Sequence, residues 1–176
     1  MRLITTVAIV AAIAAAGSGT ILYFMPIISA QLDHTKEEQK VVAINSTLPT
    51  NNNGYQQVNV TVNGVKLVAD IAANDVQRTR GLAVKDHLNE TEGMLFVFST
   101  PGNYAFWMKD MKFPIDIIWI DANKTVVHME HSLAPCTLIS CPTYPPSSNS
   151  LYVLETVAGF AEKYNVTQGT KVEFTL

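Results

Sequence analysis

Four charged residues of this sequence, Arg80, Lys109, Asp116 and Glu155, lie inside or beside apolar segments. Because an unpaired charge is strongly disfavoured in apolar surroundings, these side chains should pair with each other or stay at the rim of the fold. One interpretation is structural: ion pairs such as Arg80 with Glu155 and Lys109 with Asp116 lock strand ends. The other interpretation is a ligand site, in which the same groups converge on a pocket beside Trp107.

A carboxylate pair is the pattern here that points toward catalysis. Asp116 and Glu155 have the side chains that glycoside hydrolysis uses, provided that the fold brings them together. The sequence shows no Ser-His-Asp arrangement, no G-x-S-x-G motif and no glycine-rich phosphate loop. Asp116 could also simply point outward from its strand. A hydrolase that uses Asp116 and Glu155 therefore stays an alternative, and we predict no catalytic residues.

The histidines and cysteines give a weak basis for a metal site. His128 and His131 are three residues apart, so on a strand they point to opposite faces. A copper site of His, Met and Cys would suit an exported protein and is the second alternative. Cys136 and Cys141 favour a disulfide that closes a small loop, since a redox C-x-x-C motif has two intervening residues and this pair has four. We predict no metal and no cofactor.

Short strands and tight turns must position these residues. Asn63-Gly64 lies between two runs that alternate apolar and polar residues, which is a strong signal for a β-hairpin. The expected strands are residues 58–62, 65–71, 94–98, 104–108, 115–120, 125–131, 152–157 and 171–176. The Pro- and Ser-rich stretch 132–150 is expected to be a long loop that contains both cysteines.

Two short helices accompany the strands. Asn74 can cap a helix over residues 75–82, and Asp75 in its first turn favours the helix dipole. The second helix is expected over residues 158–164, with Asn165 as its left-handed cap. This content predicts a mainly β (α+β) domain, an antiparallel barrel or sandwich with two short helices.

The chain begins with a long apolar run. Residues 3–28 contain no charged side chain, and about 20 apolar residues suffice to cross a bilayer as a helix. A cleaved signal peptide has a shorter apolar core, so we favour an uncleaved transmembrane helix, with cleavage after Ala16 as the alternative. We therefore expect a membrane anchor or signal segment over residues 1–30, a polar linker over 31–56 and a domain over 57–176.

The charge and composition of the chain indicate which kinds of partner and which cellular location to expect. The net charge is −3, and the basic residues do not cluster, so we predict no nucleic-acid partner. With Arg2 on the inner side of a single-pass anchor, the domain would lie outside the cytoplasm. Five N-x-[ST] triplets give mild support to that location, although chance also produces them. Their asparagines are Asn45, Asn59, Asn89, Asn123 and Asn165.

An ordered set of short motifs carries a family resemblance. The motifs are R-T-R-G-L (78–82), G-M-L-F-V-F (93–98), F-W-M-K (106–109), P-I-D (114–116), Y-V-L-E (152–155) and A-G (158–159). In this order, residues 57–176 resemble the DUF192 family, also called UPF0127. The resemblance implies a small exported or membrane-anchored protein with a mainly β fold and no assigned function. Many members carry a loop cysteine pair similar to Cys136 and Cys141. After F-W-M-K the family commonly continues Asn-Thr, where this chain has Asp110-Met111.

These observations together predict a membrane-anchored, extracytoplasmic binding or envelope-associated module rather than an enzyme. Its partners would be the membrane, through the N-terminal helix, and a small ligand, a glycan or an envelope protein. The candidate ligand-binding residues are Arg80, Trp107, Lys109, Asp116 and Glu155.

Overall fold

The structure, a computed structural model, describes residues 48–176. The helical elements are α2 (Asp75–Arg80), the 3₁₀ turn η1 (Gly81–Val84) and α3 (Phe160–Lys163). The strands are β1 (Gln57–Val62), β2 (Val65–Ala72), β3 (Glu92–Gly102), β4 (Phe106–Trp107), β5 (Ile115–Ile120), β6 (Val126–Leu133), β7 (Thr143–Tyr144), β8 (Ser150–Val157) and β9 (Val172–Glu173). Within these residues, the prediction of a mainly β domain with two short helices is confirmed.

Local sequence signals explain several of these elements. Asn63 and Gly64 both have positive φ and join β1 to β2 in register, as the predicted hairpin requires. The side chain of Asn74 accepts a hydrogen bond from the amide of Gln77, which caps α2 as predicted. The predicted helix 75–82 ends earlier, because Gly81 adopts positive φ and the chain continues as η1.

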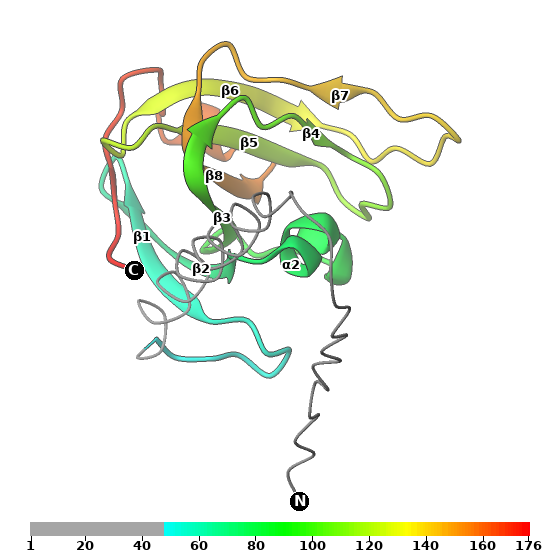
Figure 1. Cartoon of the computed structure of the whole chain (residues 1–176), viewed down its shortest axis with the longest axis horizontal. Helices are drawn as coiled ribbons and strands as arrows, with labels where there is room; N and C mark the ends of the chain where they lie inside the picture. Colours follow the sequence, from blue (N-terminus) through cyan, green and yellow to red (C-terminus); the bar gives the residue numbers. More distant parts are fainter. Residues whose placement is uncertain (1–47) are drawn as a thin grey trace, which may run out of the picture.

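Seven strands form one sheet in the order β6-β5-β8-β3-β2-β1-β9, and β4 pairs with β7 separately (Figure 1). All neighbouring strands are antiparallel except β2 and β3. That parallel pair departs from the expected antiparallel pattern. It arises because α2 and η1 form a crossover between β2 and β3, which returns the chain in the same direction.

The sheet curls until its two edge strands meet at one end. The amide of Val126 donates to the carbonyl of Thr170, and the amide of Val172 donates to the carbonyl of Lys124. The curl encloses an apolar interior, to which α3 also contributes Phe160. Fully buried side chains of this interior include Val60, Leu67, Leu95, Ile118 and Leu154.

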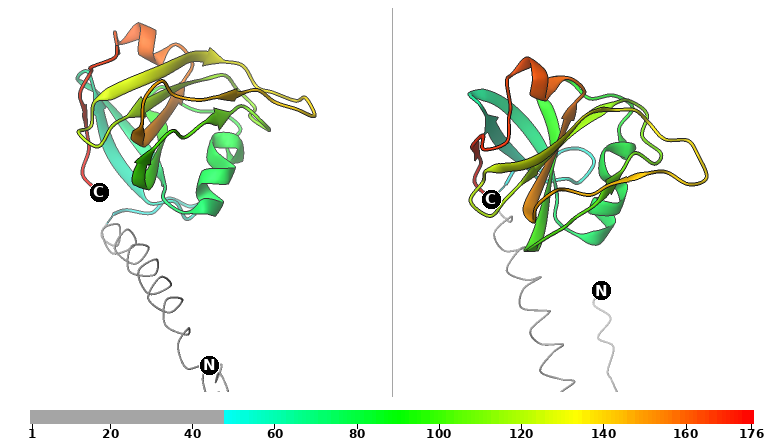
Figure 2. Two further views of the ribbon diagram at one scale, coloured as in Figure 1. Left: turned by 45° about the horizontal axis from the view of Figure 1, so that its top comes forward. Right: turned by 90° about the horizontal axis from the view of Figure 1, so that it is seen from above.

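The opposite face of the same sheet carries a second apolar cluster. Strand alternation sends every second side chain of β3, β5 and β8 to this face. Phe96, Trp119 and Val153 lie there, together with Met108 from the segment after β4. Figure 2 shows the arm that contains β4 and β7 projecting from the sheet above α2. Glu155, two residues after Val153 on β8, points to this covered face rather than into the curl.

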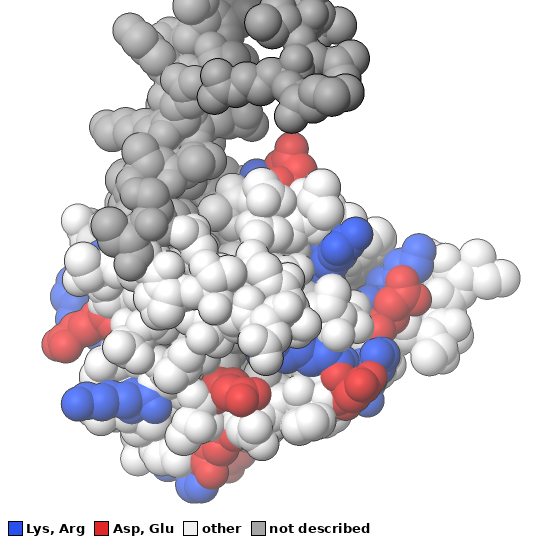
Figure 3. Space-filling model, turned by 90° about the horizontal axis from the view of Figure 1, so that it is seen from below, with Lys and Arg blue, Asp and Glu red and all other residues white. Residues whose placement is uncertain are grey.

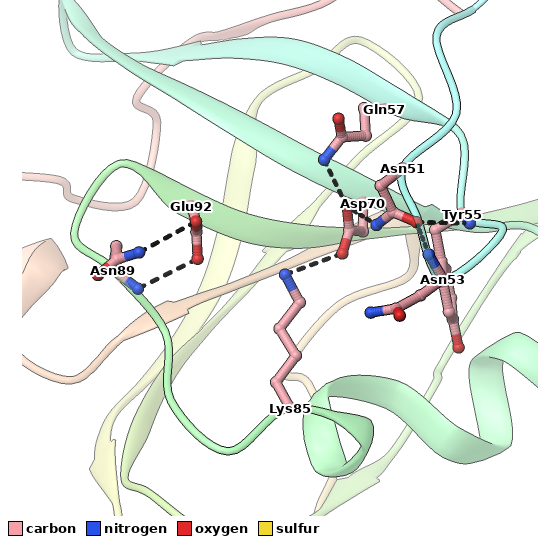
Figure 4. A network of polar contacts seen from close by, with 8 residues as sticks. All are labelled: Asn51, Asn53, Tyr55, Gln57, Asp70, Lys85, Asn89 and Glu92. Atoms are coloured by element: carbon pink, nitrogen blue, oxygen red, sulfur yellow. Dashed lines mark hydrogen bonds and ion pairs between the residues drawn. The ribbon is translucent and has the colours of Figure 1, made fainter.

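Residues 48–56 belong to the folded domain, although the sequence pattern placed them in a linker. Tyr55 is buried. In Figure 4, the buried carboxylate of Asp70 accepts hydrogen bonds from the Asn51 and Gln57 side chains at 2.9 and 2.8 Å. Lys85, which follows η1, forms an ion pair with the same carboxylate at 2.9 Å. The network therefore ties this segment and η1 to β2.

The predicted N-terminal anchor, residues 1–30, and residues 31–47 of the predicted linker lie outside the described residues. Between Leu48 and Leu176, no helix has the length and apolar character needed to span a membrane.

A disulfide joins Cys136 and Cys141 at the tip of the loop between β6 and β7. We expect the double variant Cys136→Ser/Cys141→Ser to lose about 2 kcal/mol of unfolding free energy, because closing so short a loop restricts the unfolded chain only modestly. Urea unfolding of the variant and the oxidised protein measures the difference. Equal midpoints and slopes for the two proteins would contradict a stabilising role for this bond.

Candidate functional site

A cavity of about 460 Å³ lies on the covered face of the sheet. Its walls come from α2 and η1 on one side, the segment around β4 on the other, and β3 and β8 at the base. Four of the five residues singled out from the sequence line this cavity: Arg80, Trp107, Lys109 and Glu155. The fold thus brings together groups that are up to 75 positions apart, since Arg80 and Glu155 are contributed by α2 and β8.

Glu155 is the most unusual group of the cavity. Its side chain is almost completely buried, with 4% of the residue exposed. The backbone amide of Leu82 donates a hydrogen bond to the carboxyl group, but Oε2 has no hydrogen-bond partner. Burial raises the pKa of Glu155 from its ordinary value of 4.5 to about 8, against the opposing effect of the Leu82 amide. The carboxyl group is therefore mainly protonated at neutral pH.

Gly81 allows α2 and η1 to approach this carboxyl group closely. Its φ of +49° lies in the region that favours glycine. A Cβ atom at this position would lie 3.4 Å from the ring of Phe96 and 3.8 Å from Oε2 of Glu155. The turn after α2 therefore favours glycine for its backbone conformation, while the distances place this turn in van der Waals range of Phe96 and Glu155.

The basic side chains around the cavity differ in the hydrogen bonds and ion pairs that they form. Arg78 donates to the carbonyl groups of Ala73 and Val97 and forms an ion pair with Asp75 at 2.6 Å. Arg80 and Lys109 are exposed, and within residues 48–176 neither forms an ion pair. Two positive charges at the cavity mouth are therefore left without a counter-ion in the described domain.

Trp107 and Lys109 lie next to each other on the β4 side of the mouth. The Lys109 ammonium lies 5.5 Å from the centre of the Trp107 ring, and 47% of Trp107 is exposed. On the face of the domain seen from below, basic and acidic side chains are interspersed, as Figure 3 shows.

Aromatic rings form much of the wall, and sequence reasoning missed most of them. Phe98 and Tyr104 stack with ring centres 3.5 Å apart, and Phe96 meets Phe106 edge-on at 4.8 Å. Phe106 lines the cavity and also packs against Trp119. The usable signal was the aromatic density of residues 104–107, which the fold places opposite β3.

Asp116 does not line this cavity. Its carboxylate is completely buried on the other face of β5 and accepts hydrogen bonds from three backbone amides. These come from Ser132 at 2.7 Å, Gly159 at 3.0 Å and Ala161 at 2.8 Å. Asp116 thus joins β6 and the start of α3 to β5, which is a structural role rather than the ligand contact that its sequence context suggested.

Neither of the ion pairs that the sequence suggested forms within the described domain. Asp116 bonds to backbone amides and Lys109 stays at the surface, while Glu155 is held by Leu82 rather than by Arg80. Asp116 pairs with Thr156 across β5 and β8, whereas Glu155 pairs with Ile117. The two carboxyl groups therefore point to opposite faces, so they cannot act as a catalytic pair on one substrate.

Three of the residues suggested for copper, His128, Cys136 and Cys141, are engaged elsewhere. Both cysteine sulfurs are in the disulfide, and His128 contacts Glu130 and Ser147. Among residues 48–176, no three His, Cys, Asp or Glu side chains gather in a way that could hold a metal ion.

Comparison with known proteins places the domain in a family whose role is not assigned. The DUF192 family model, described as "Uncharacterized ACR", matches residues 57–174. A crystal structure of a protein of unknown function from Novosphingobium aromaticivorans is 28% identical, with a TM-score of 0.65 over 75% of this chain and 96% of its own. A proposed transcription regulator from Sinorhizobium meliloti, 24% identical, has the same fold, with a TM-score of 0.61 over 68% of this chain and 95% of its own. No curated protein matches.

Proposed function

The chain belongs to the DUF192 family, and we propose that its domain is a non-catalytic module that binds a small organic molecule beside Glu155. The cavity is concave and is lined by aromatic side chains together with several polar ones, a combination that is typical of small-molecule sites. We place the domain outside the cytoplasm. The disulfide and the apolar run of residues 3–28 support that location.

The unpartnered oxygen of Glu155 carries this proposal. Buried polar atoms almost always have a hydrogen-bond partner, because an unmet group costs about 1–3 kcal/mol. Oε2 lacks such a partner and belongs to a residue that lines an open cavity. A bound molecule with a hydrogen-bonding group would satisfy this oxygen, which a purely structural role does not explain.

Fluorescence of Trp107 provides the test. The chain has two tryptophans; Trp107 borders the cavity, while Trp119 is fully buried. We expect titration of the full-length protein with neutral, anionic and cationic ring compounds to give a saturable change in emission for at least one class. The same change should be absent from Trp107→Phe. If no class binds at millimolar concentration, the proposed function is wrong.

Lys109→Ala separates a binding role from a structural one. Lys109 is exposed, and its described side-chain contact is the Trp107 ring, so we expect the unfolding free energy to fall by less than about 1 kcal/mol. Binding of an anionic compound should weaken. Lys112→Ala is the matched control, because Lys112 pairs with Asp86 and does not line the cavity. A large loss of stability with unchanged binding would support the structural interpretation instead.

A further inference from the structure

Three features of the cavity are independent of each other, and each restricts its ligand. The floor holds a buried carboxyl oxygen without a partner, on Glu155. The mouth holds two exposed cations without ion-pair partners in the described domain, Arg80 and Lys109. Between floor and mouth, the walls are aromatic rings, among them Phe98 and Phe106.

We infer that the ligand is a small aromatic acid with an anionic group at one end and a hydroxyl or carbonyl group at the other. This inference rests on the proposed function, since it names the ligand class of the same cavity. The ring lies between the aromatic walls, the anionic group lies at the mouth beside Arg80 and Lys109, and the second polar group meets Glu155.

The buried carboxyl group of Glu155 is the reason why the ligand needs a hydroxyl or carbonyl group at its inner end. Burial holds the pKa of Glu155 at about 8, so at neutral pH its carboxyl group can both donate and accept a hydrogen bond. A site built around a buried polar group discriminates against an analogue that leaves the group unpaired. The ligand therefore needs an oxygen at its inner end as well as a charge at its outer end.

The charges at the mouth argue against a cationic ligand. Of the charged groups that line the cavity, Asp75 is paired with Arg78, and Glu155 is mainly neutral at pH 7. Arg80 and Lys109 then leave the mouth with positive potential, which favours an anion.

The polar groups of the wall argue against a sugar. Tyr104 donates its hydroxyl hydrogen to the carbonyl of Thr100, and the side-chain amide of Asn103 donates to the carbonyl of Pro146. These groups are thus already engaged, whereas a sugar would bring many hydroxyl groups that need partners. An aromatic ring needs none and can stack on the partly exposed aromatic walls.

Four simple probes test this inference with the full-length protein: 4-hydroxybenzoate, 4-hydroxybenzamide, benzoate and tyramine. They vary the outer charge from negative to neutral to positive, and benzoate removes the inner hydroxyl. We expect 4-hydroxybenzoate to bind best, with the amide and benzoate each weaker by about tenfold and tyramine weaker still. Calorimetric titration at pH 7 gives the dissociation constants. The preference for the acid over the amide should shrink at high salt, because the mouth is exposed to solvent.

Lysine variants then test which residue causes the preference for the acid over the amide. Lys109→Gln should reduce the ratio of acid to amide affinity, and Lys112→Gln should leave this ratio as it is. Equal or tighter binding of the amide or of tyramine overturns the acid specificity but keeps a binding cavity. Binding by none of the four probes, nor by other ring compounds, would overturn the proposed function as well.

Discussion

Glu155→Gln is expected to raise the unfolding free energy above that of the native protein at pH 8.5 and to change it little at pH 5. Glutamine has nearly the same shape as protonated glutamate and can still accept the hydrogen bond from Leu82, but it cannot ionise. At pH 5 the buried carboxyl group is protonated in the folded protein, so the two side chains are nearly equivalent. At pH 8.5 the native carboxyl group must either ionise in its buried site or remain protonated above its pKa. Both states lower the unfolding free energy of the native protein.

The direction of this pH dependence follows from the pKa values of Glu155 in the folded and unfolded protein. Glu155 has a pKa of about 8 in the folded protein and an ordinary value of 4.5 when exposed. The folded state therefore binds more protons between these values, and its stability falls as pH rises through this range. The stabilisation from the raised pKa is fully present below pH 4.5 and is lost as pH rises through about 8. Linkage over this interval amounts to roughly 3–5 kcal/mol.

Chemical unfolding at pH 5, 7 and 8.5 measures this effect. The difference between Glu155→Gln and the native protein should grow steadily with pH. Glu173→Gln is the matched control, because Glu173 is exposed on β9 rather than buried. A constant difference for Glu155→Gln across the three pH values would show that Glu155 is ionised in the folded protein.

Asp116→Ala is expected to cost about 3–5 kcal/mol of unfolding free energy, as does the removal of one partner from other buried charged networks. The change leaves the amides of Ser132, Gly159 and Ala161 without their acceptor. Because these amides belong to β6 and to the start of α3, both elements should loosen. Hydrogen exchange of the three amides should therefore accelerate together.

Two further variants sharpen this prediction. Asp116→Asn keeps one acceptor oxygen but replaces the other with an NH₂ group, which cannot accept from a backbone amide. It should therefore be destabilised, but less than Asp116→Ala. Asp110→Asn is the control: Asp110 is exposed, and asparagine tolerates its positive φ of 59°. Near-native stability of Asp116→Ala would refute the structural role that we assign to this carboxylate.

The local elements of this protein could be predicted from its sequence, because each depends on residues close along the chain. The turn at Asn63-Gly64 and the cap at Asn74 need particular backbone angles or a nearby side-chain acceptor. The mainly apolar run of residues 115–120 gave a strand with the bounds that β5 has. The pair β4 and β7 was only partly foreseen, because two-residue strands such as Thr143–Tyr144 leave no periodic signal.

The candidate site was predictable in part. Charge in an apolar context identified Arg80, Lys109 and Glu155, which do line one cavity together with Trp107. The same signal selected Asp116, because a sequence does not tell whether a buried charge meets a ligand or a set of backbone amides. The aromatic wall was missed, since Phe98 and Phe106 have the same pattern whether they fill a core or border a cavity.

The sequence by itself determined the short strands, their turns, the family and the small group of charged residues in apolar surroundings. Only the tertiary structure decided which of these residues meet. Strand pairing places Asp116 and Glu155 on opposite faces of adjacent strands, and the crossover through α2 and η1 brings Gly81 and Leu82 against Glu155. The physical reason is that burial and hydrogen bonding depend on contacts between distant segments, whereas turns and alternation depend on neighbours along the chain.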